Sequence, residues 1–151
     1  YALQPEGPPG TWRQGWFSPN AAIATALALI LLGVLGIHAR QRARAGRLGM
    51  AAVAIGCLGV ALLAAVRVAV DLDLVPAWPA VGAAFAVFFV GLLLLGATII
   101  RAGVLPRAAG GLLILGVLAF FIGNFEDASI WLFGLFGAAW LWLGYAVWSS
   151  E

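Results

Sequence analysis

Hydrophobic residues come in long uninterrupted runs, separated by short stretches that hold the charged residues. Each run reaches or approaches the roughly 20 residues that an α-helix needs to cross about 30 Å of hydrocarbon. Polar and apolar positions do not alternate within the runs, as the strands of a membrane barrel would require. Helices are the structure that satisfies the backbone hydrogen bonds of such runs in lipid. The pattern predicts five transmembrane helices, at about residues 20–38, 48–70, 79–101, 107–123 and 128–148.

Composition favours a membrane protein over a soluble domain. Of the 151 residues, 64% are hydrophobic and 9% are charged, whereas soluble domains carry about 25% charged residues. A soluble chain of this composition would expose large apolar patches and aggregate. We therefore expect an all-α integral membrane protein, with an outer N-terminal segment at residues 1–19 and a five-helix transmembrane bundle at residues 20–151.

Charged residues between the expected helices sort by sign to the two sides of the membrane. The loops after the first and third helices are basic and fall on the same side; they hold Arg40, Arg42, Arg44, Arg47, Arg101 and Arg107. Short Arg-rich loops stay cytoplasmic, which predicts that the N-terminus lies outside and the C-terminus in the cytoplasm. We interpret the arginines as a topology signal that also contacts lipid. Nucleic-acid binding is not expected, because no aromatic residues interleave with them.

An internal repeat runs through the basic loops. Residues 44–60 align without gaps with residues 101–117, and the two segments share Arg-Ala-Gly, Ala-Ala and Leu-Gly-Val. This predicts a tandem two-helix unit, with copies stacked in the same orientation. Counted as hairpins, the repeat lacks its first helix, so we expect a helix upstream of Tyr1, with a cleaved signal peptide as the alternative.

Small residues recur at steps of three and four in the second and fourth expected helices, which places them on one helical face. Such faces let helix backbones approach closely in lipid, where the hydrophobic effect no longer drives association. We expect these residues to pack helix against helix. They are Gly49, Ala52, Gly56, Gly59, Gly116 and Gly123.

Candidate ligand groups are few. His38, the only histidine, lies at the inner end of the first expected helix and could be an axial ligand of haem or chlorophyll, although an ordinary interfacial side chain is the simpler interpretation. Four carboxylates at the outer mouth could bind Ca²⁺ or Mg²⁺ or attract a cationic solute; they are Asp71, Asp73, Glu126 and Asp127. Arg67 lies four residues before Asp71 and could instead pair with it.

Two stretches carry a resemblance to known proteins. The segment RAGVLPR at residues 101–107 and the segment WLWLGY at residues 140–145 resemble parts of uncharacterised multi-pass membrane proteins of GC-rich bacteria. The similarity extends over about residues 80–148. It implies the multi-pass architecture and a location in the bacterial inner membrane, and it carries no activity.

The function we expect is that of a non-catalytic accessory or scaffold subunit of a larger membrane complex. It would contact membrane lipids and either other subunits or copies of itself, and no cofactor is predicted. One alternative is a small transporter or channel with an acidic outer vestibule, and another is a pigment- or haem-binding subunit that uses His38. No span holds a charge at mid-membrane, which argues against a pump or a proton-coupled transporter. An enzyme is not expected.

Overall fold

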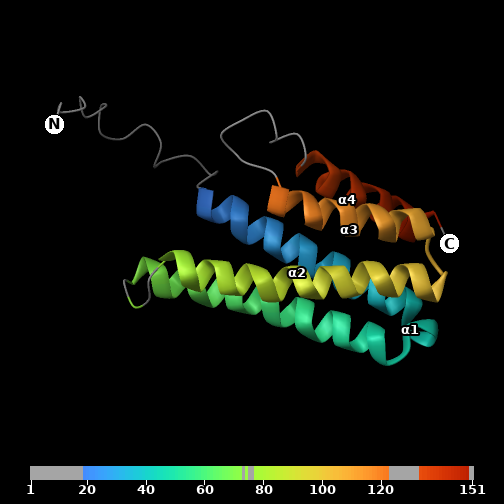
Figure 1. The fold of residues 1–151 in the computed structure, drawn as a ribbon, viewed down its shortest axis with the longest axis horizontal. Helices are drawn as coiled ribbons and strands as arrows, with labels where there is room; N and C mark the ends of the chain where they lie inside the picture. The colour runs from blue at the N-terminus through green and yellow to red at the C-terminus, as the bar shows by residue number, and fades with distance from the viewer. Residues whose placement is uncertain (1–18, 73, 75–76, 123–132, 150–151) are drawn as a thin grey trace.

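The computed structural model describes residues 19–72, 74, 77–122 and 133–149, and almost all of them lie in helices (Figure 1). The four helices are α1 (Pro19–Asp71), α2 (Ala77–Ala102), α3 (Arg107–Ile122) and α4 (Phe133–Trp148). No strand occurs in this part of the chain. The expected all-α class is therefore confirmed.

α1 spans 53 residues and consists of two helices that meet at Gly46. It is broken at Gly46, whose backbone has φ 58° and ψ −152°. This region is open essentially only to glycine, which has no Cβ to clash. The chain folds back at this point, so that residues 19–45 (the N-arm) and residues 47–71 (the C-arm) run side by side in opposite directions (Figure 1).

The helix boundaries differ from the sequence prediction most clearly in α1. Residues 39–45 were expected to form a loop, but they continue the N-arm as helix, because arginine and alanine are both good helix formers. The first two expected helices are therefore both present, and the connection between them is shorter than expected, with Gly46 as its non-helical residue. α2 and α3 lie close to the expected bounds, and α4 begins at Phe133; its expected start at residue 128 lies outside the described residues.

Glycines bring the C-arm and α2 into close contact. A Cβ atom added to Gly59 would lie 2.6 Å from the backbone nitrogen of Phe88 on α2. Farther along the same pair of helices, a Cβ atom on Gly91 would lie 2.5 Å from Cα of Gly56. Both distances are too short for a real side chain, so these two helices meet backbone to backbone. This is the packing that small residues permit in a membrane.

The next helix pairs are joined in the same way. A Cβ atom added to Gly96 of α2 would lie 3.0 Å from the carbonyl oxygen of Gly110 on α3. On α3, a Cβ atom on Gly116 would lie 2.7 Å from Cα of Phe136 on α4. α2 therefore packs between α1 and α3, α3 also packs against α4, and the contact between α1 and α4 is the slightest of all.

The structure buries most of the residues that were expected to pack helices together. Those in its described part are all buried: Gly49, Ala52, Gly56, Gly59 and Gly116. The remaining one, Gly123, lies outside the described residues.

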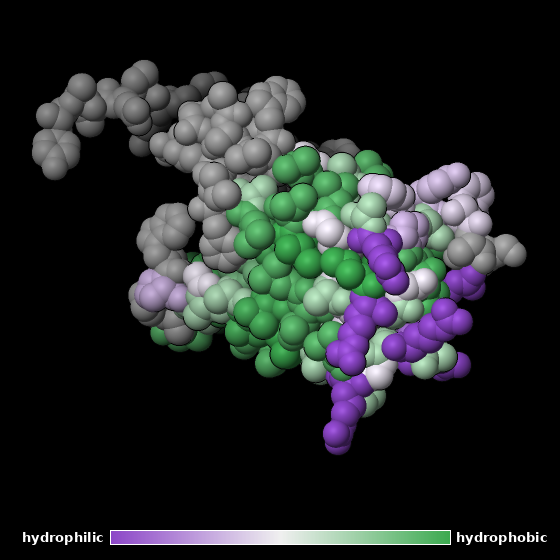
Figure 2. All heavy atoms as spheres, turned by 45° about the vertical axis from the view of Figure 1, so that its right-hand side comes forward, coloured by the Kyte–Doolittle hydropathy of each residue, from purple (hydrophilic) through white to green (hydrophobic). Residues whose placement is uncertain are grey.

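Apolar side chains fill the interior and also cover the sides of the bundle. Leu92, Leu113 and Leu143 are fully buried in the core, and large hydrophobic residues are exposed along every helix, so that the flank of the bundle is apolar (Figure 2). Within the described residues, two stretches are long and apolar enough to cross a membrane, Thr25–Val70 and Pro79–Ala102. The 16-residue helices α3 and α4 are shorter than such a span.

Corresponding positions of the expected repeat behave alike. Gly46 and Gly103 are equivalent in the alignment, and both have positive φ, 58° and 61°. Gly59 and Gly116 are also equivalent, and each lies against the backbone of a phenylalanine on the following helix. The amide of Gly103 donates a 3.2 Å hydrogen bond to the carbonyl of Ile99, which ends α2 in the manner of a glycine C-cap.

Replacement of Gly46 by alanine tests the break in α1. We expect Gly46→Ala to lower the melting temperature, because a side chain in this backbone region costs about 1–3 kcal/mol. The matched control is Gly36→Ala in the N-arm, where an added Cβ meets nothing within 4 Å and alanine favours the helix. Thermal unfolding of both variants in detergent, followed by circular dichroism, checks this. Equal melting temperatures for the two variants would contradict it.

Candidate functional site

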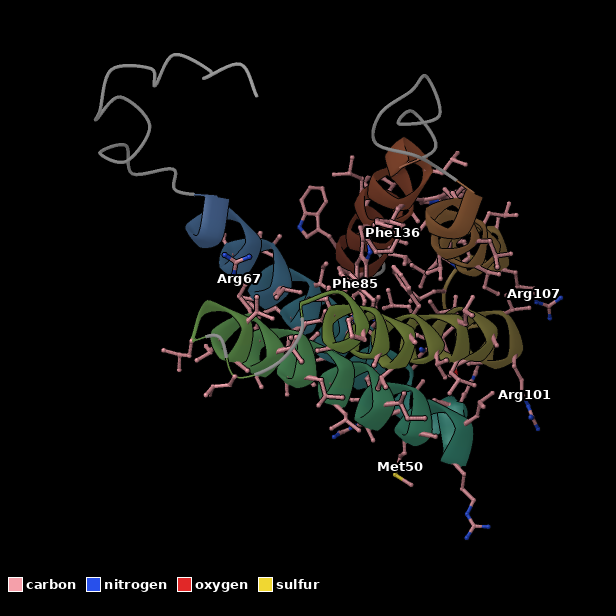
Figure 3. All side chains as sticks on the ribbon, turned by 60° about the vertical axis from the view of Figure 1, so that its left-hand side comes forward. Met50, Arg67, Phe85, Arg101, Arg107 and Phe136 are labelled. Carbon is pink, nitrogen blue, oxygen red and sulfur yellow. The ribbon has the colours of Figure 1, made fainter. Side chains whose placement is uncertain are left out.

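The arginines expected on one side of the membrane gather at one end of the bundle (Figure 2). The break at Gly46 and the turn between α2 and α3 both lie at this end (Figure 1), which brings the two basic segments of the sequence together. Figure 3 places Arg101 and Arg107 at this end and Arg67 toward the other. All the members of this arginine end are exposed: Arg40, Arg42, Arg44, Arg47, Arg101 and Arg107.

The side chains of the four carboxylates expected at the outer end of the bundle lie outside the described part of the structure. Asp71 is the last residue of α1, and the other three are Asp73, Glu126 and Asp127. The described residues contain no group of three or more His, Cys, Asp or Glu side chains placed to hold a metal ion. The cation site and the pairing of Arg67 with Asp71 therefore stay predictions.

His38 lies where the N-arm packs against the C-arm. Its Nδ1 atom is 3.8 Å from the position that a Cβ on Gly49 would take, and that nitrogen is buried without a hydrogen-bond partner. Thr98 of α2 reaches the same place, with its Cγ2 atom 3.3 Å from that Cβ position. The hydroxyl of Thr98 donates a 2.7 Å hydrogen bond to the carbonyl of Leu94 in its own helix.

Gln41 is a buried polar residue that the sequence analysis missed. Its side chain is 1% exposed, and neither its amide nitrogen nor its amide oxygen has a hydrogen-bond partner. It continues the buried stripe of the N-arm, one helical turn after Ile37 and one turn before Ala45. Only the extension of the helix through the arginine run reveals this position as a buried one.

A groove runs between the N-arm of α1 and α4, on the side where these helices barely touch. Its volume is about 590 Å³. Three of its glycines, Gly36, Gly137 and Gly144, face open space, since an added Cβ would meet nothing within 4 Å. The lining is apolar throughout: Leu29, Ile30, Leu32, Gly33, Gly36, Ile37, Gly137, Trp140, Leu141, Leu143, Gly144 and Val147.

Trp140 acts as a spacer in this groove. Its indole Cζ3 atom lies 2.7 Å from the Cβ position of Gly33 on the N-arm, so the ring stands between the two helices where glycine leaves room for it. The ring also meets Phe136 edge-on, with the two centroids 6.1 Å apart. A tryptophan at this position keeps α4 from closing on the N-arm, which leaves the groove open on either side of the ring.

Aromatic rings connect the spacer to the rest of the bundle. Phe136 packs edge-on against Phe120 of α3 at 5.2 Å, and Phe120 packs against Phe89 of α2 at the same centroid distance. Phe85 stacks on Phe89 at 5.6 Å. Figure 3 labels the two ends of this series, Phe85 on α2 and Phe136 on α4. Each such pair contributes about 0.5–1.5 kcal/mol beyond its buried area. Together the ring pairs hold α4, the helix that carries Trp140, in place against α3 and α2.

Comparisons with protein-family models, curated proteins and solved structures find no match to this chain. The resemblance over residues 80–148 therefore stays a prediction.

The buried amide of Gln41 makes a direct prediction about stability. Gln41→Leu should raise the melting temperature, because it removes a desolvated amide whose unmade hydrogen bonds cost about 1–3 kcal/mol and replaces it with a side chain of similar size. Gln41→Ala, the control, should lower it by leaving a cavity. Thermal unfolding in detergent measures both. A loss of stability in the leucine variant as large as in the alanine variant would show that the amide has a bound partner.

Proposed function

We propose that this protein is a multi-pass integral membrane protein that serves, without catalysis, as an accessory or scaffold subunit of a larger membrane complex. The observation that carries the proposal is the outward face of α4. Leu141, Tyr145 and Trp148 lie on one face of this helix at helical spacing, and they are 78%, 62% and 75% exposed. No other helix in the described part of the chain covers them.

The same face of α4 has small residues along its other half. Gly134 and Ala138 precede Leu141 at helical spacing and are exposed as well. Small residues let a neighbouring helix approach closely in lipid, and tyrosine and tryptophan are enriched among the residues that dominate binding at interfaces. This combination favours a transmembrane helix of a partner subunit over lipid alone.

Five crossings of the membrane are supported by the way the helices alternate. The N-arm, the C-arm, α2, α3 and α4 run in alternating directions along the bundle (Figure 1), and all of them carry exposed apolar side chains. α3 and α4 are short, but α3 lies alongside α2 and α4 lies alongside α3. The equivalent behaviour of Gly46 and Gly103 supports duplication of a two-helix unit. The arginine end faces the cytoplasm under the positive-inside rule.

The two alternative functions stay predictions. The carboxylates that would form the vestibule of a transporter lie outside the described residues. His38 as a haem or chlorophyll ligand is not favoured, because its Nδ1 atom is buried against the C-arm and its side chain lies on the face of the N-arm opposite the groove.

Native mass spectrometry of the protein extracted from its own membranes tests the subunit proposal. We expect a complex that contains the 15.7 kDa chain together with another polypeptide. The double variant Tyr145→Ala/Trp148→Ala should lose that polypeptide, because it truncates two large exposed side chains of α4 that lie outside the groove. The control Met50→Ala/Leu58→Ala truncates exposed apolar residues of α1 and should keep it. A chain that runs alone in every sample would overturn the proposal.

A further inference from the structure

The groove between the N-arm and α4 matches one leaflet of a bilayer in length. Its lining on the N-arm extends from Leu29 to Ile37, and Arg40 follows one turn after Gly36. From Leu29 to Arg40 the helix rises about 16 Å. One leaflet contributes half of the roughly 30 Å hydrocarbon layer, or about 15 Å. An acyl chain lying in the groove would therefore place its headgroup at the level of Arg40.

Two arginines continue the line of the groove toward the arginine end. At 100° per residue, the groove residues Leu29, Gly33 and Gly36 lie on one face of the N-arm. Arg40 and Arg44 extend that face by one and two turns, and both side chains are exposed. Arg42 points to the opposite side of the helix. The apolar groove therefore ends at two positively charged side chains, those of Arg40 and Arg44.

The groove suits a flexible hydrocarbon chain. Its floor at Ile37 and Leu143 is buried and apolar, and the glycines Gly36, Gly137 and Gly144 face open space. The indole of Trp140 lies against Gly33 in the middle of the groove, and a flexible chain can bend past it.

We propose that this groove is a binding site for an anionic phospholipid of the leaflet at the arginine end. One acyl chain lies along Gly36, Gly137 and Gly144, and the phosphate of the headgroup is held by Arg40 and Arg44. Anionic lipids are the partners that basic sites between transmembrane helices select on the cytoplasmic side. The inference rests on the proposed function, because it requires the protein to be inserted in a membrane. It assigns a specific ligand to the groove, which lies beside the outward face of α4.

Native mass spectrometry of the purified protein with added lipid tests the site. Phosphatidylglycerol and phosphatidylcholine with identical acyl chains are titrated separately. We expect one molecule of phosphatidylglycerol to bind at least about tenfold more tightly, since each arginine near an anionic headgroup contributes about 1 kcal/mol, or fivefold. Arg40→Gln/Arg44→Gln should abolish the preference. Arg42→Gln, which removes one of the neighbouring charges from the other face, should keep it.

A second pair of variants tests the acyl-chain bed. Gly36→Leu and Gly144→Leu fill the groove at positions where an added Cβ meets nothing within 4 Å, so the helices can keep their places. Both should weaken the binding of either lipid by at least about tenfold. Gly82→Leu, at an equally open glycine of α2 outside the groove, should bind as the unmodified protein does. Circular dichroism melting confirms that each variant is folded.

Three results would overturn the lipid site. The first is equal binding of the two lipids, and the second is an equal loss of preference in the Arg42 variant and the Arg40/Arg44 variant. The third is full binding by the filled-groove variants, which would mean that headgroups are attracted to the arginine end in general. A second copy of the chain or a partner helix released by Gly36→Leu would assign the groove to protein. Resistance to alkaline carbonate extraction separates this inference from the proposed function, because a protein extracted by carbonate is not integral at all.

Discussion

Close approach of helix backbones at glycine is the contact on which the rest of this structure depends. In the membrane that we propose for this protein, the hydrophobic effect would not press helices together, so packing at short range has to do so. Gly59 against Phe88, Gly91 against Gly56, and Gly116 against Phe136 fix successive helices at backbone distance. The N-arm and α4 lack such a contact, because Trp140 stands at Gly33. Glycine therefore permits close contact between successive helices, and it also lines the groove between the N-arm and α4.

The break at Gly46 decides which chemistry the arginine end can present. If residues 39–45 were a loop, their arginines would be interchangeable charges. As helix, they are directional: Arg40 and Arg44 extend the face that lines the groove, whereas Arg42 extends the opposite face. The buried amide of Gln41 lies on the same stretch. Because residues 39–45 are helical, the arginines that set the orientation of the protein in the membrane also lie on two distinct faces of the N-arm.

Composition and run length were enough to predict the all-α class, the approximate position of α2 and α3, and the segregation of arginines to one end. These features depend on local sequence and on the thickness of a bilayer. The helical course of residues 39–45, the burial of Gln41 and the groove beside Trp140 could not be predicted, because each depends on which helices become neighbours. The break at Gly46 could have been predicted from the repeat, because the aligned residue Gly103 is followed three residues later by Pro106, which marks a turn.

Accessibility of single cysteines from the two sides of the membrane tests the central claim, a bundle that crosses the bilayer with its arginine end inside. Cys57 is first replaced by serine, and Leu74→Cys and Ser149→Cys are introduced separately, at exposed positions near opposite ends of the bundle. In right-side-out vesicles, a membrane-impermeant maleimide should label the cysteine at 74 directly and the cysteine at 149 only after permeabilisation. Labelling of both positions without permeabilisation would contradict this arrangement.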